Sequence, residues 1–164
     1  MSRCPTPVTI SIASPDAEDG RRVLRAYFAD LVSRYHRRPA TDEEIDAALA
    51  EEPSDDLTLP RGLFLLAYRE QEVIGCGGLR LLPADLGEVT RLFVVPGARG
   101  QGLGAQLLDE LEGAARARGL SRLRLDTRGD LVEARRLYAR QGYTEVPPFS
   151  AGPYAEHWFA KALD

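Results

Sequence analysis

The first part of the chain changes from a two-residue to a four-residue spacing of apolar positions. Residues 8–14 read VTISIAS, where β-branched and small residues alternate, and this period predicts a strand. Pro15 and Asp16 then provide turn and cap residues. Across residues 16–35 large apolar side chains recur at every fourth position, which predicts a helix with one apolar stripe. The stripe consists of Val23, Tyr27, Leu31 and Tyr35.

A second, acidic helix is predicted after Pro39. Thr41 followed three residues later by Glu44 has the spacing of a capping box, in which each residue satisfies a backbone amide of the other. Three apolar residues of this helix fall on one face and are expected to point inward. They are Ile45, Ala48 and Leu49.

Three apolar runs follow, at residues 63–69, 73–82 and 88–95, with short polar breaks between them. Their Leu, Val, Ile and Phe content predicts antiparallel strands joined as a meander. Gly75, Gly77 and Gly78 lie inside the second run. Glycine weakens a strand unless a bulge or a close backbone approach is needed there, so one of these features is expected.

The rest of the chain predicts alternating helices and strands. Residues 103–118 have helical apolar spacing with Gly119 as a typical helix end, and residues 122–127 alternate as a strand. Asp130 followed by Glu133 predicts the start of a helix that reaches residue 141. Residues 143–146 and 157–163 read as terminal strands. The predicted order is β-α-α-β-β-β-α-β-α-β-β, a mixed α/β fold in a single domain, residues 1–164.

Composition excludes several classes of protein. A chain of 164 residues fits one domain, and its longest apolar run, residues 63–68, is far shorter than the roughly 20 residues that span a bilayer. The N-terminal residues lack the apolar segment of a secretory signal, so we expect a cytoplasmic protein without a membrane partner. The net charge of -4 argues against a nucleic-acid partner, because such proteins neutralise phosphates with basic surface.

The cysteines and histidines do not predict a metal site. Cys4 and Cys76 form no CxxC pair, and His36 and His157 are far apart in the sequence. Cys76 lies in an apolar stretch, where a buried free thiol is the usual outcome. Either histidine could serve as a base only if the fold brings it to a site.

Charge is distributed unevenly along the chain. Residues 41–56 contain eight acids and no base, whereas residues 96–141 contain nine arginines and six acids. The first segment could attract a cationic ligand and the second a phosphorylated one. The alternative is a solvated acidic helix together with ordinary surface arginines.

A glycine-rich turn, RGQGLG at residues 99–104, stands between a predicted strand and a predicted helix. Glycines leave backbone amides unshielded, and the helix dipole favours negative charge at this end, so a pyrophosphate is the natural ligand. The alternative is a turn that only lets the helix pack closely on the sheet. A Walker A loop is excluded because the chain has no Gly-Lys pair. A dinucleotide fingerprint stays open, since Gly100, Gly102 and Ala105 match GxGxxA and Asp126 ends the next strand.

At these residues the chain resembles the GNAT superfamily of acetyl-CoA-dependent N-acetyltransferases, whose phosphate-binding motif is Arg/Gln-x-x-Gly-x-Gly/Ala. Arg99, Gly102 and Gly104 match that motif, and EARRLYARQGY at residues 133–143 looks like the family's later helix and strand start. The resemblance implies a central, twisted, mostly antiparallel sheet of about seven strands flanked by four helices. It also implies acetyl-CoA as cosubstrate and no metal.

The resemblance implies roles for individual residues. In the family the fourth strand carries a bulge and diverges from its neighbour, so that free backbone groups pair with pantetheine. Carried over, the end of this strand would flank the pantetheine and the turn would hold the pyrophosphate, although simple core burial is the alternative for the strand. The implied cofactor-binding residues are Phe93, Val94, Val95, Arg99, Gly100, Gln101, Gly102, Leu103, Gly104 and Ala105.

Two catalytic residues are implied by the same resemblance. Tyr138 matches the tyrosine that protonates the leaving thiolate, although its position on the apolar side of a helix also fits a core residue. Glu88 looks like the acid that some members use as general base toward the amine, directly or through water. The alternative for Glu88 is an ion pair with an arginine such as Arg91 or Arg80.

The function expected on these grounds is direct acetyl transfer from acetyl-CoA to a primary amine, with a small-molecule substrate and a ternary complex. The acidic segment favours a cationic amine. Two other functions stay open: a non-catalytic acyl-CoA-binding regulatory module and a dinucleotide-binding oxidoreductase. The sequence leaves the oligomeric state open, including a homodimer.

Overall fold

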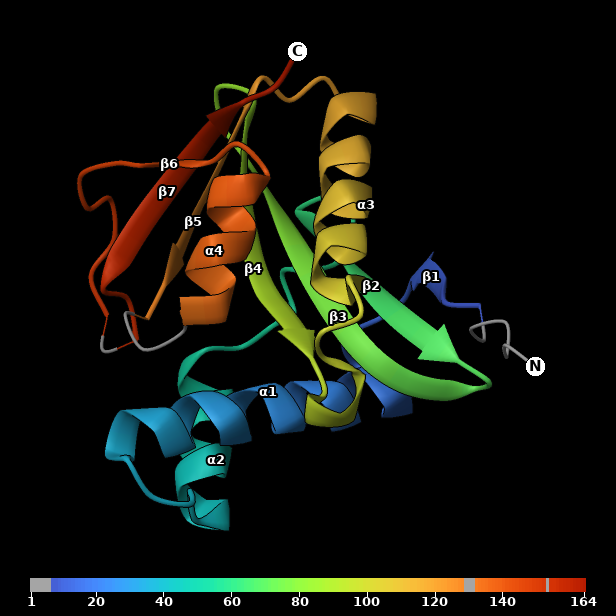
Figure 1. Ribbon diagram of the computed structural model, residues 1–164, viewed down its shortest axis with the longest axis vertical. Helices are drawn as coiled ribbons and strands as arrows, with labels where there is room; N and C mark the ends of the chain where they lie inside the picture. The colour runs from blue at the N-terminus through green and yellow to red at the C-terminus, as the bar shows by residue number, and fades with distance from the viewer. Residues whose placement is uncertain (1–6, 129–131, 153) are drawn as a thin grey trace.

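The computed structural model describes residues 7–128, 132–152 and 154–164. These residues form one seven-stranded sheet with helices on both faces (Figure 1), in the strand order β1-β2-β3-β4-β5-β7-β6. The elements are β1 (Thr9–Ile12), α1 (Glu18–His36), α2 (Asp42–Glu51), β2 (Gly62–Arg69), β3 (Glu72–Leu82), β4 (Leu86–Val94), α3 (Leu103–Ala117), β5 (Arg122–Thr127), α4 (Val132–Arg140), β6 (Thr144–Glu145) and β7 (His157–Ala162).

The predicted fold class, element order and meander are confirmed. Neighbouring strands pair antiparallel except β4 and β5, which pair parallel. A sheet of this kind is unlike the parallel sheet of a dinucleotide-binding fold. A short 3-10 turn, Pro96–Ala98, follows β4 and was not predicted. Asp130, the predicted helix cap, lies outside the described residues.

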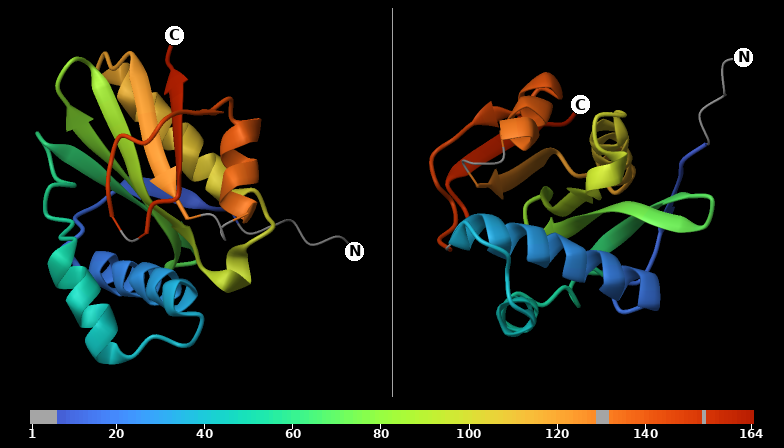
Figure 2. Two further views of the ribbon diagram at one scale, coloured as in Figure 1. Left: turned by 90° about the vertical axis from the view of Figure 1, so that its left-hand side faces the viewer. Right: turned by 60° about the horizontal axis from the view of Figure 1, so that its bottom comes forward.

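The helices form two layers around the sheet (Figure 2). On one face α3 contacts β2, β3 and β4 and buries Leu107, Leu108 and Leu111 completely. On the other face α1 contacts β3 and β4, and α2 packs against α1. Apolar burial on both faces stabilises the sheet between these layers.

The first two helices differ in one respect from their predicted patterns. The capping box is confirmed, because the Thr41 hydroxyl accepts from the Glu44 amide at 3.1 Å and the Glu44 carboxylate accepts from the Thr41 amide at 2.9 Å. The apolar stripe of α1 is wrong at Tyr35, which is 44% exposed. Because α1 packs against both the sheet and α2, its buried face is wider than one stripe and includes Leu24 and Phe28.

A bulge interrupts β4 opposite the glycines of β3. Cys76 pairs with Phe93 and Gly78 with Thr90, so Arg91 and Leu92 together oppose Gly77. The extra residue changes which face the following side chains occupy. Phe93 consequently packs in the cluster beneath α1, whereas Leu92 and Val94 pack in the cluster beneath α3. The bulge of the fourth strand, which the family resemblance implied, is thus present. Of the two features expected at the glycines of β3, a close backbone approach is found, since a Cβ on Gly75 would lie 2.8 Å from the carbonyl oxygen of Phe93.

β4 and β5 separate after Glu88, before the bulge is reached. They pair only where Leu86–Glu88 of β4 lies beside Arg122–Arg124 of β5. Figure 1 shows the two strands diverging toward the end of the sheet where α1 lies. The β5-facing backbone edge of β4 after Glu88 is therefore free of a strand partner among the described residues.

A buried ion pair connects α3 to β7 and to the end of α4. Lys161 donates to the Glu112 carboxylate at 2.8 Å and to the carbonyl of Gln141 at 2.7 Å. Glu112, which is only 3% exposed, also accepts from the Tyr143 hydroxyl at 3.1 Å. These bonds fix α4 relative to α3, and so fix the position of the side chains that α4 presents.

We expect Lys161→Met to lower the free energy of unfolding by about 3 kcal/mol, because it leaves the Glu112 carboxylate buried without its main cation. Urea denaturation measures the change. Arg118→Met is the control, since the exposed Arg118 bonds only a helix carbonyl, at 3.3 Å, and should cost less than about 0.5 kcal/mol. Equal stabilities of the two variants would show that the pair does not anchor α4.

Candidate active site

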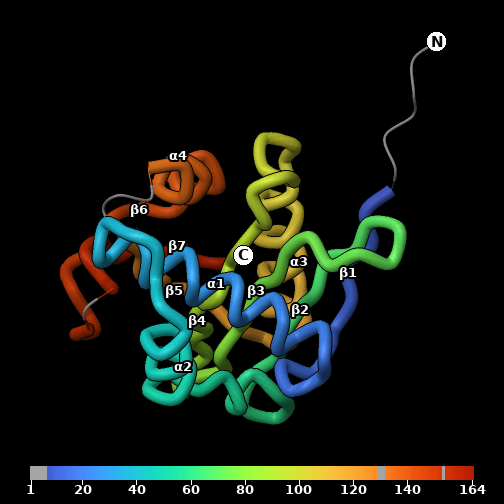
Figure 3. The backbone as a smooth tube through the Cα atoms, turned by 90° about the horizontal axis from the view of Figure 1, so that it is seen from below, coloured from blue at the N-terminus to red at the C-terminus, as the bar shows by residue number. Residues whose placement is uncertain are grey.

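The gap between β4 and β5 opens into a cleft of about 1060 Å³. Figure 3, which views the molecule from below, shows α1 crossing beneath the ends of the strands, with α3 and α4 beyond them. Ten of the twelve predicted site residues line this cleft. They are Glu88, Phe93, Val94, Arg99, Gly100, Gly102, Leu103, Gly104, Ala105 and Tyr138.

Val95 and Gln101 do not line the cleft. The amide of Val95 donates to the carbonyl of Ile74 at 3.0 Å, and its side chain packs against the core. Gln101 accepts from the Arg69 guanidinium at 2.7 Å on the far side of the turn. The cofactor contacts expected of Val95 and Gln101 stay predictions, and the geometry of the cleft does not favour them.

The glycine-rich turn presents bare backbone to the cleft. Gly100 and Gly102 have φ of 78° and 80°, and a Cβ added to either would meet no atom within 4 Å. Helix packing therefore does not require glycine at these two positions, whereas at Gly104 a Cβ would lie 3.2 Å from Leu137 of α4. The first intrahelical bond runs from Gln106 to Gly102, and no described residue accepts from the amides of Leu103, Gly104 or Ala105. The turn fits a pyrophosphate, because unpaired amides and the helix dipole favour an anion.

Arg99 ties the turn to the end of β4. Its Nε donates to the carbonyl of Val94 at 2.9 Å, and its guanidinium lies 5.6 Å from the centre of the Phe93 ring. A second contact, 3.9 Å long, reaches Asp30 of α1. Arg99 thus holds the strand end and the helix start in register, and its charge adds to the positive potential of the turn.

Tyr138 lies on α4 at the wall of the cleft. Its ring packs against Tyr143 and Phe159, with centroid distances of 5.9 and 5.8 Å. No described residue forms a hydrogen bond with its hydroxyl. Burial, with smaller contributions from Tyr27 and Asp126, raises the pKa of Tyr138. The phenol therefore stays protonated at neutral pH and can donate a proton or a hydrogen bond.

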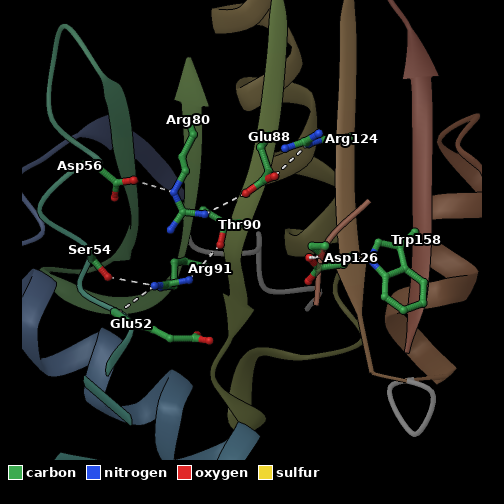
Figure 4. Close-up of polar contacts among 11 residues, drawn as sticks. Glu52, Ser54, Asp56, Arg80, Glu88, Thr90, Arg91, Arg124, Asp126 and Trp158 are labelled. Carbon is green, nitrogen blue, oxygen red and sulfur yellow. Dashed lines mark hydrogen bonds and ion pairs between the residues drawn. The ribbon is translucent and has the colours of Figure 1, made fainter. Parts of the chain in front are cut away.

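Glu88 sits in a row of charges that crosses three strands (Figure 4). Arg80 of β3, Glu88 of β4 and Arg124 of β5 are direct cross-strand neighbours. Arg80 donates to Glu88 Oε1 and Arg124 donates to Glu88 Oε2, each at 2.9 Å. Asp56 extends the row by accepting from Arg80 at 2.7 Å. Both carboxylate oxygens of Glu88 are thus engaged, one by the predicted alternative Arg80 and the other by an arginine that sequence reasoning did not name.

Arg91 does not pair with Glu88. As the bulge residue it has φ of 57°, and it is 5% exposed. It donates to the carbonyl of Glu52, to Ser54 Oγ and to Thr90 Oγ1 at 3.0, 3.2 and 2.9 Å. The Phe28 ring lies 5.0 Å from its guanidinium carbon. Arg91 therefore braces the bulge against the segment that follows α2 (Figure 4).

Asp126 is a cleft residue that the sequence suggested only for a dinucleotide. Its Oδ2 accepts from Ser150 Oγ at 3.1 Å, and Ser150 Oγ accepts from the indole nitrogen of Trp158 at 2.8 Å. Desolvation by the walls of the cleft is the main cause that raises the pKa of Asp126 above its ordinary value, although the residue itself is solvent-exposed in the open cleft. The sequence signal for a place of Asp126 in the cleft is its position at the end of a predicted strand. Its contact with Ser150 has no such signal, because the two residues are distant along the chain.

Comparison with known proteins agrees with this geometry. A sequence profile described as the acetyltransferase (GNAT) family matches residues 25–143. The chain belongs to the GNAT acetyltransferase family. The resemblance found in the sequence is thereby confirmed, and the mixed sheet with four helices is the GNAT fold.

Individual relatives cover different parts of this GNAT chain. An IAA acetyltransferase from Azospirillum brasilense is 44% identical over 101 residues, which are 60% of this chain and 63% of that protein, less than two thirds of its length. A structure named as a candidate acyl-CoA N-acyltransferase from Klebsiella pneumoniae is 28% identical, with a TM-score of 0.74, over 96% of this chain and 98% of that one. The PaiA N-acetyltransferase of Thermoplasma acidophilum, solved with coenzyme A, is 19% identical, with a TM-score of 0.72, over 96% and 99%.

The structure also bears on the metal sites and membrane-spanning segments considered from the sequence. Within the described ranges, no three His, Cys, Asp or Glu side chains are grouped so as to hold a metal ion. No helix in that part of the chain is long and apolar enough to span a membrane. Cys76 is a buried free thiol, as predicted, and it donates to the carbonyl of Arg91 at 3.1 Å.

We expect Gly102→Val to weaken acetyl-CoA binding by at least about tenfold, or about 1.4 kcal/mol, because its side chain would shield the amides of the turn. Isothermal titration calorimetry measures the affinity. Gly119→Val is a matched control, since Gly119 has φ of 76°, open space around it and a position at the opposite end of α3. An equal loss of affinity in both variants would assign the effect to backbone strain and not to the turn.

Proposed function

We propose that this protein transfers the acetyl group of acetyl-CoA to a primary amine of a small molecule, by direct attack in a ternary complex. The observation that carries the proposal is one cleft that joins the bare amides of the α3 turn, the unpaired end of β4 and the Tyr138 phenol. Membership of the GNAT family and the acetyltransferase name of the Azospirillum relative support it.

Different groups along the cleft would bind different parts of acetyl-CoA. Amides of the turn and of the first turn of α3 bind the pyrophosphate, and the free edge of β4 after the bulge binds the pantetheine arm through its backbone. A backbone amide near Phe93 can stabilise charge on the acetyl oxygen. Acetyl-CoA supplies the acetyl group as a thioester when bound. Tyr138 donates to the sulfur as negative charge develops there, because its hydroxyl is protonated at neutral pH and bonds no described residue.

The amine would enter from the α1 and α2 side of the cleft. Four acids of the acidic segment, Glu51, Glu52, Asp55 and Asp56, line that side. Asp56 and Asp55 are paired with Arg80 and Arg61, at 2.7 and 3.6 Å. The carboxylates of Glu51 and Glu52 have no hydrogen-bond or ion-pair partner among the described residues. We therefore propose a preference for cationic amines.

Tyr138→Phe should lower kcat by about 100-fold and leave the affinity for acetyl-CoA unchanged, because it removes only the hydroxyl that meets the sulfur. A thiol-release assay under single-turnover conditions isolates the chemical step, and calorimetry measures binding. Tyr35→Phe is the control, since Tyr35 is an exposed residue of α1 outside the cleft lining. Wild-type turnover in Tyr138→Phe would remove Tyr138 from the mechanism.

The acceptor class is tested with a panel of spermidine, kanamycin, glycine and glutamate. We expect spermidine or kanamycin to have the highest kcat/KM at low salt, and their advantage over glutamate to shrink in 1 M salt, where the Debye length is about 3 Å. Replacing Glu51 and Glu52 together by Gln should reduce the same advantage at low salt. Equal efficiency for cationic and anionic amines would contradict the cationic preference. No thiol release with any amine, despite acetyl-CoA binding, would instead favour a non-catalytic binding module.

A further inference from the structure

We propose that Asp126 is the group that accepts the proton of the reacting amine, which places the amino group of the acceptor at the free edge of β5 inside the cleft. The inference rests on the proposed acetyl transfer and assigns a residue to its proton-transfer step.

Asp126 lies where β5 has lost its partner on the β4 side. The pairing of β4 with β5 ends at Arg124, two residues earlier, while Asp126 still pairs with Trp158 of β7 on the other side. Arg124 and Asp126 occupy the same face of β5, since side chains alternate along a strand and Leu123 and Leu125 are buried in the core on the opposite face. Asp126 therefore shares the face of Glu88, but stands past the charged row, where the strands have separated (Figure 4).

The carboxylate of Asp126 is oriented through one oxygen only. Ser150 donates to Oδ2, and Trp158 holds Ser150 in turn. No described residue donates to Oδ1, and Asp126 lines the cleft. One oxygen is thus fixed by the protein and the other is available to a ligand, which is the arrangement required of a base that must face its substrate.

Glu88, the other candidate, differs in this respect. Each of its oxygens accepts from an arginine at 2.9 Å, so an amine would have to compete with two guanidinium groups. The same row of arginines limits the repulsion between Glu88 and Asp126 without bonding Asp126 itself. The two acids therefore differ: both oxygens of Glu88 are paired with arginines, whereas Asp126 has one oxygen without a donor among the described residues.

The charged and titratable groups around Asp126 come from several elements. Desolvation by the cleft walls is the largest cause of the raised pKa of Asp126, and Glu88 on β4 raises it further. The Ser150 hydroxyl, Arg80 on β3 and Arg124 on β5 lower it. Tyr138 on α4 and Tyr27 on α1 face the same charge, and Asp126 contributes to the raised pKa of both, about 12 for Tyr27. Nearby, Arg128 pairs with Glu156 at 3.7 Å and His157 with Glu145 at 3.0 Å. The raised pKa of Asp126 lies closer to neutral pH than that of an ordinary aspartate, which makes its carboxylate a better base.

The step balances in protons and electrons. The acceptor enters as an ammonium, and Asp126 takes one proton, which frees the lone pair of nitrogen. That pair forms the C–N bond to the acetyl carbon, and the C–S bond breaks with its electron pair on sulfur. Tyr138 gives its proton to the thiolate. The nitrogen loses its second proton to solvent after the C–N bond forms, and solvent returns one proton to Tyr138. Asp126 then releases its proton to solvent, so that one proton leaves per amide formed.

The test is the pH dependence of kcat/KM for the amine of the panel with the highest efficiency. In the wild type we expect kcat/KM to fall on the acid side of the profile, where Asp126 becomes protonated and can no longer deprotonate the ammonium. The apparent pKa of this acid limb should lie above the ordinary Asp value of about 3.9. In Asp126→Asn the acid limb should move up toward the pKa of the free amine, and kcat/KM at pH 7 should fall by about 100-fold or more. The affinity for acetyl-CoA should not change.

Two further variants test the assignment in opposite directions. Ser150→Ala removes a donor to the carboxylate, so the limb should move to higher pH. Glu88→Gln removes a neighbouring negative charge, so the limb should persist and move to lower pH. Asp109→Asn, an exposed acid of α3 outside the cleft lining, is the matched control and should leave the profile unchanged. Asp126→Asn should change the free energy of unfolding little, because Asp126 is solvent-exposed in the open cleft.

Each outcome bears on one proposal. A uniform loss of activity at all pH values in Asp126→Asn, with the limb unmoved, would overturn the role of Asp126 as base and leave the acetyl transfer standing. Loss of the limb in Glu88→Gln but not in Asp126→Asn would assign the proton to Glu88. A wild-type protein that acetylates no amine of the panel would contradict the proposed function, and the role of Asp126 with it.

Discussion

The cleft depends on the separation of β4 from β5, which begins after Glu88 and continues through the bulge at Arg91 and Leu92. The extra residue, opposite Gly77, changes the face on which the following side chains lie. Without that divergence, β4 and β5 would continue as an ordinary parallel pair, and no backbone edge would face the space between them. The bulge is held by neutral acceptors around the Arg91 guanidinium and by the Cys76 thiol at the Arg91 carbonyl.

The same divergence determines which charges are available in the cleft. Where the strands still pair, Arg80, Glu88 and Arg124 lie in direct register and neutralise one another. Two residues further along β5 no strand pairs on that side, and among the described residues only the Ser150 hydroxyl donates to the Asp126 carboxylate. Backbone register therefore separates an acid with a structural ion-pair role from an acid with an open oxygen, although both lie on one face of the sheet.

Much of this arrangement could be predicted from the sequence because it depends on local patterns. Apolar periodicity and caps predicted the order of elements, glycine spacing located the turn, and the family resemblance implied the bulge of β4. Tyr35 was assigned wrongly because one helix period cannot show that α1 packs against two elements. The engagement of Glu88 by Arg124 and the contact of Asp126 with Ser150 depend on strand register and on a distant loop, and neither is encoded in local spacing.

Local departures from the most stable conformations and contacts gather around the cleft. Arg91 adopts a left-handed conformation, and the amides at the start of α3 lack partners among the described residues. Both features raise the free energy of the unliganded fold. A ligand that pairs with these amides would bind the folded state alone and stabilise it by mass action. The location of these unfavourable groups is thus an independent argument, separate from any resemblance, that the gap between β4 and β5 is where this protein binds its substrates.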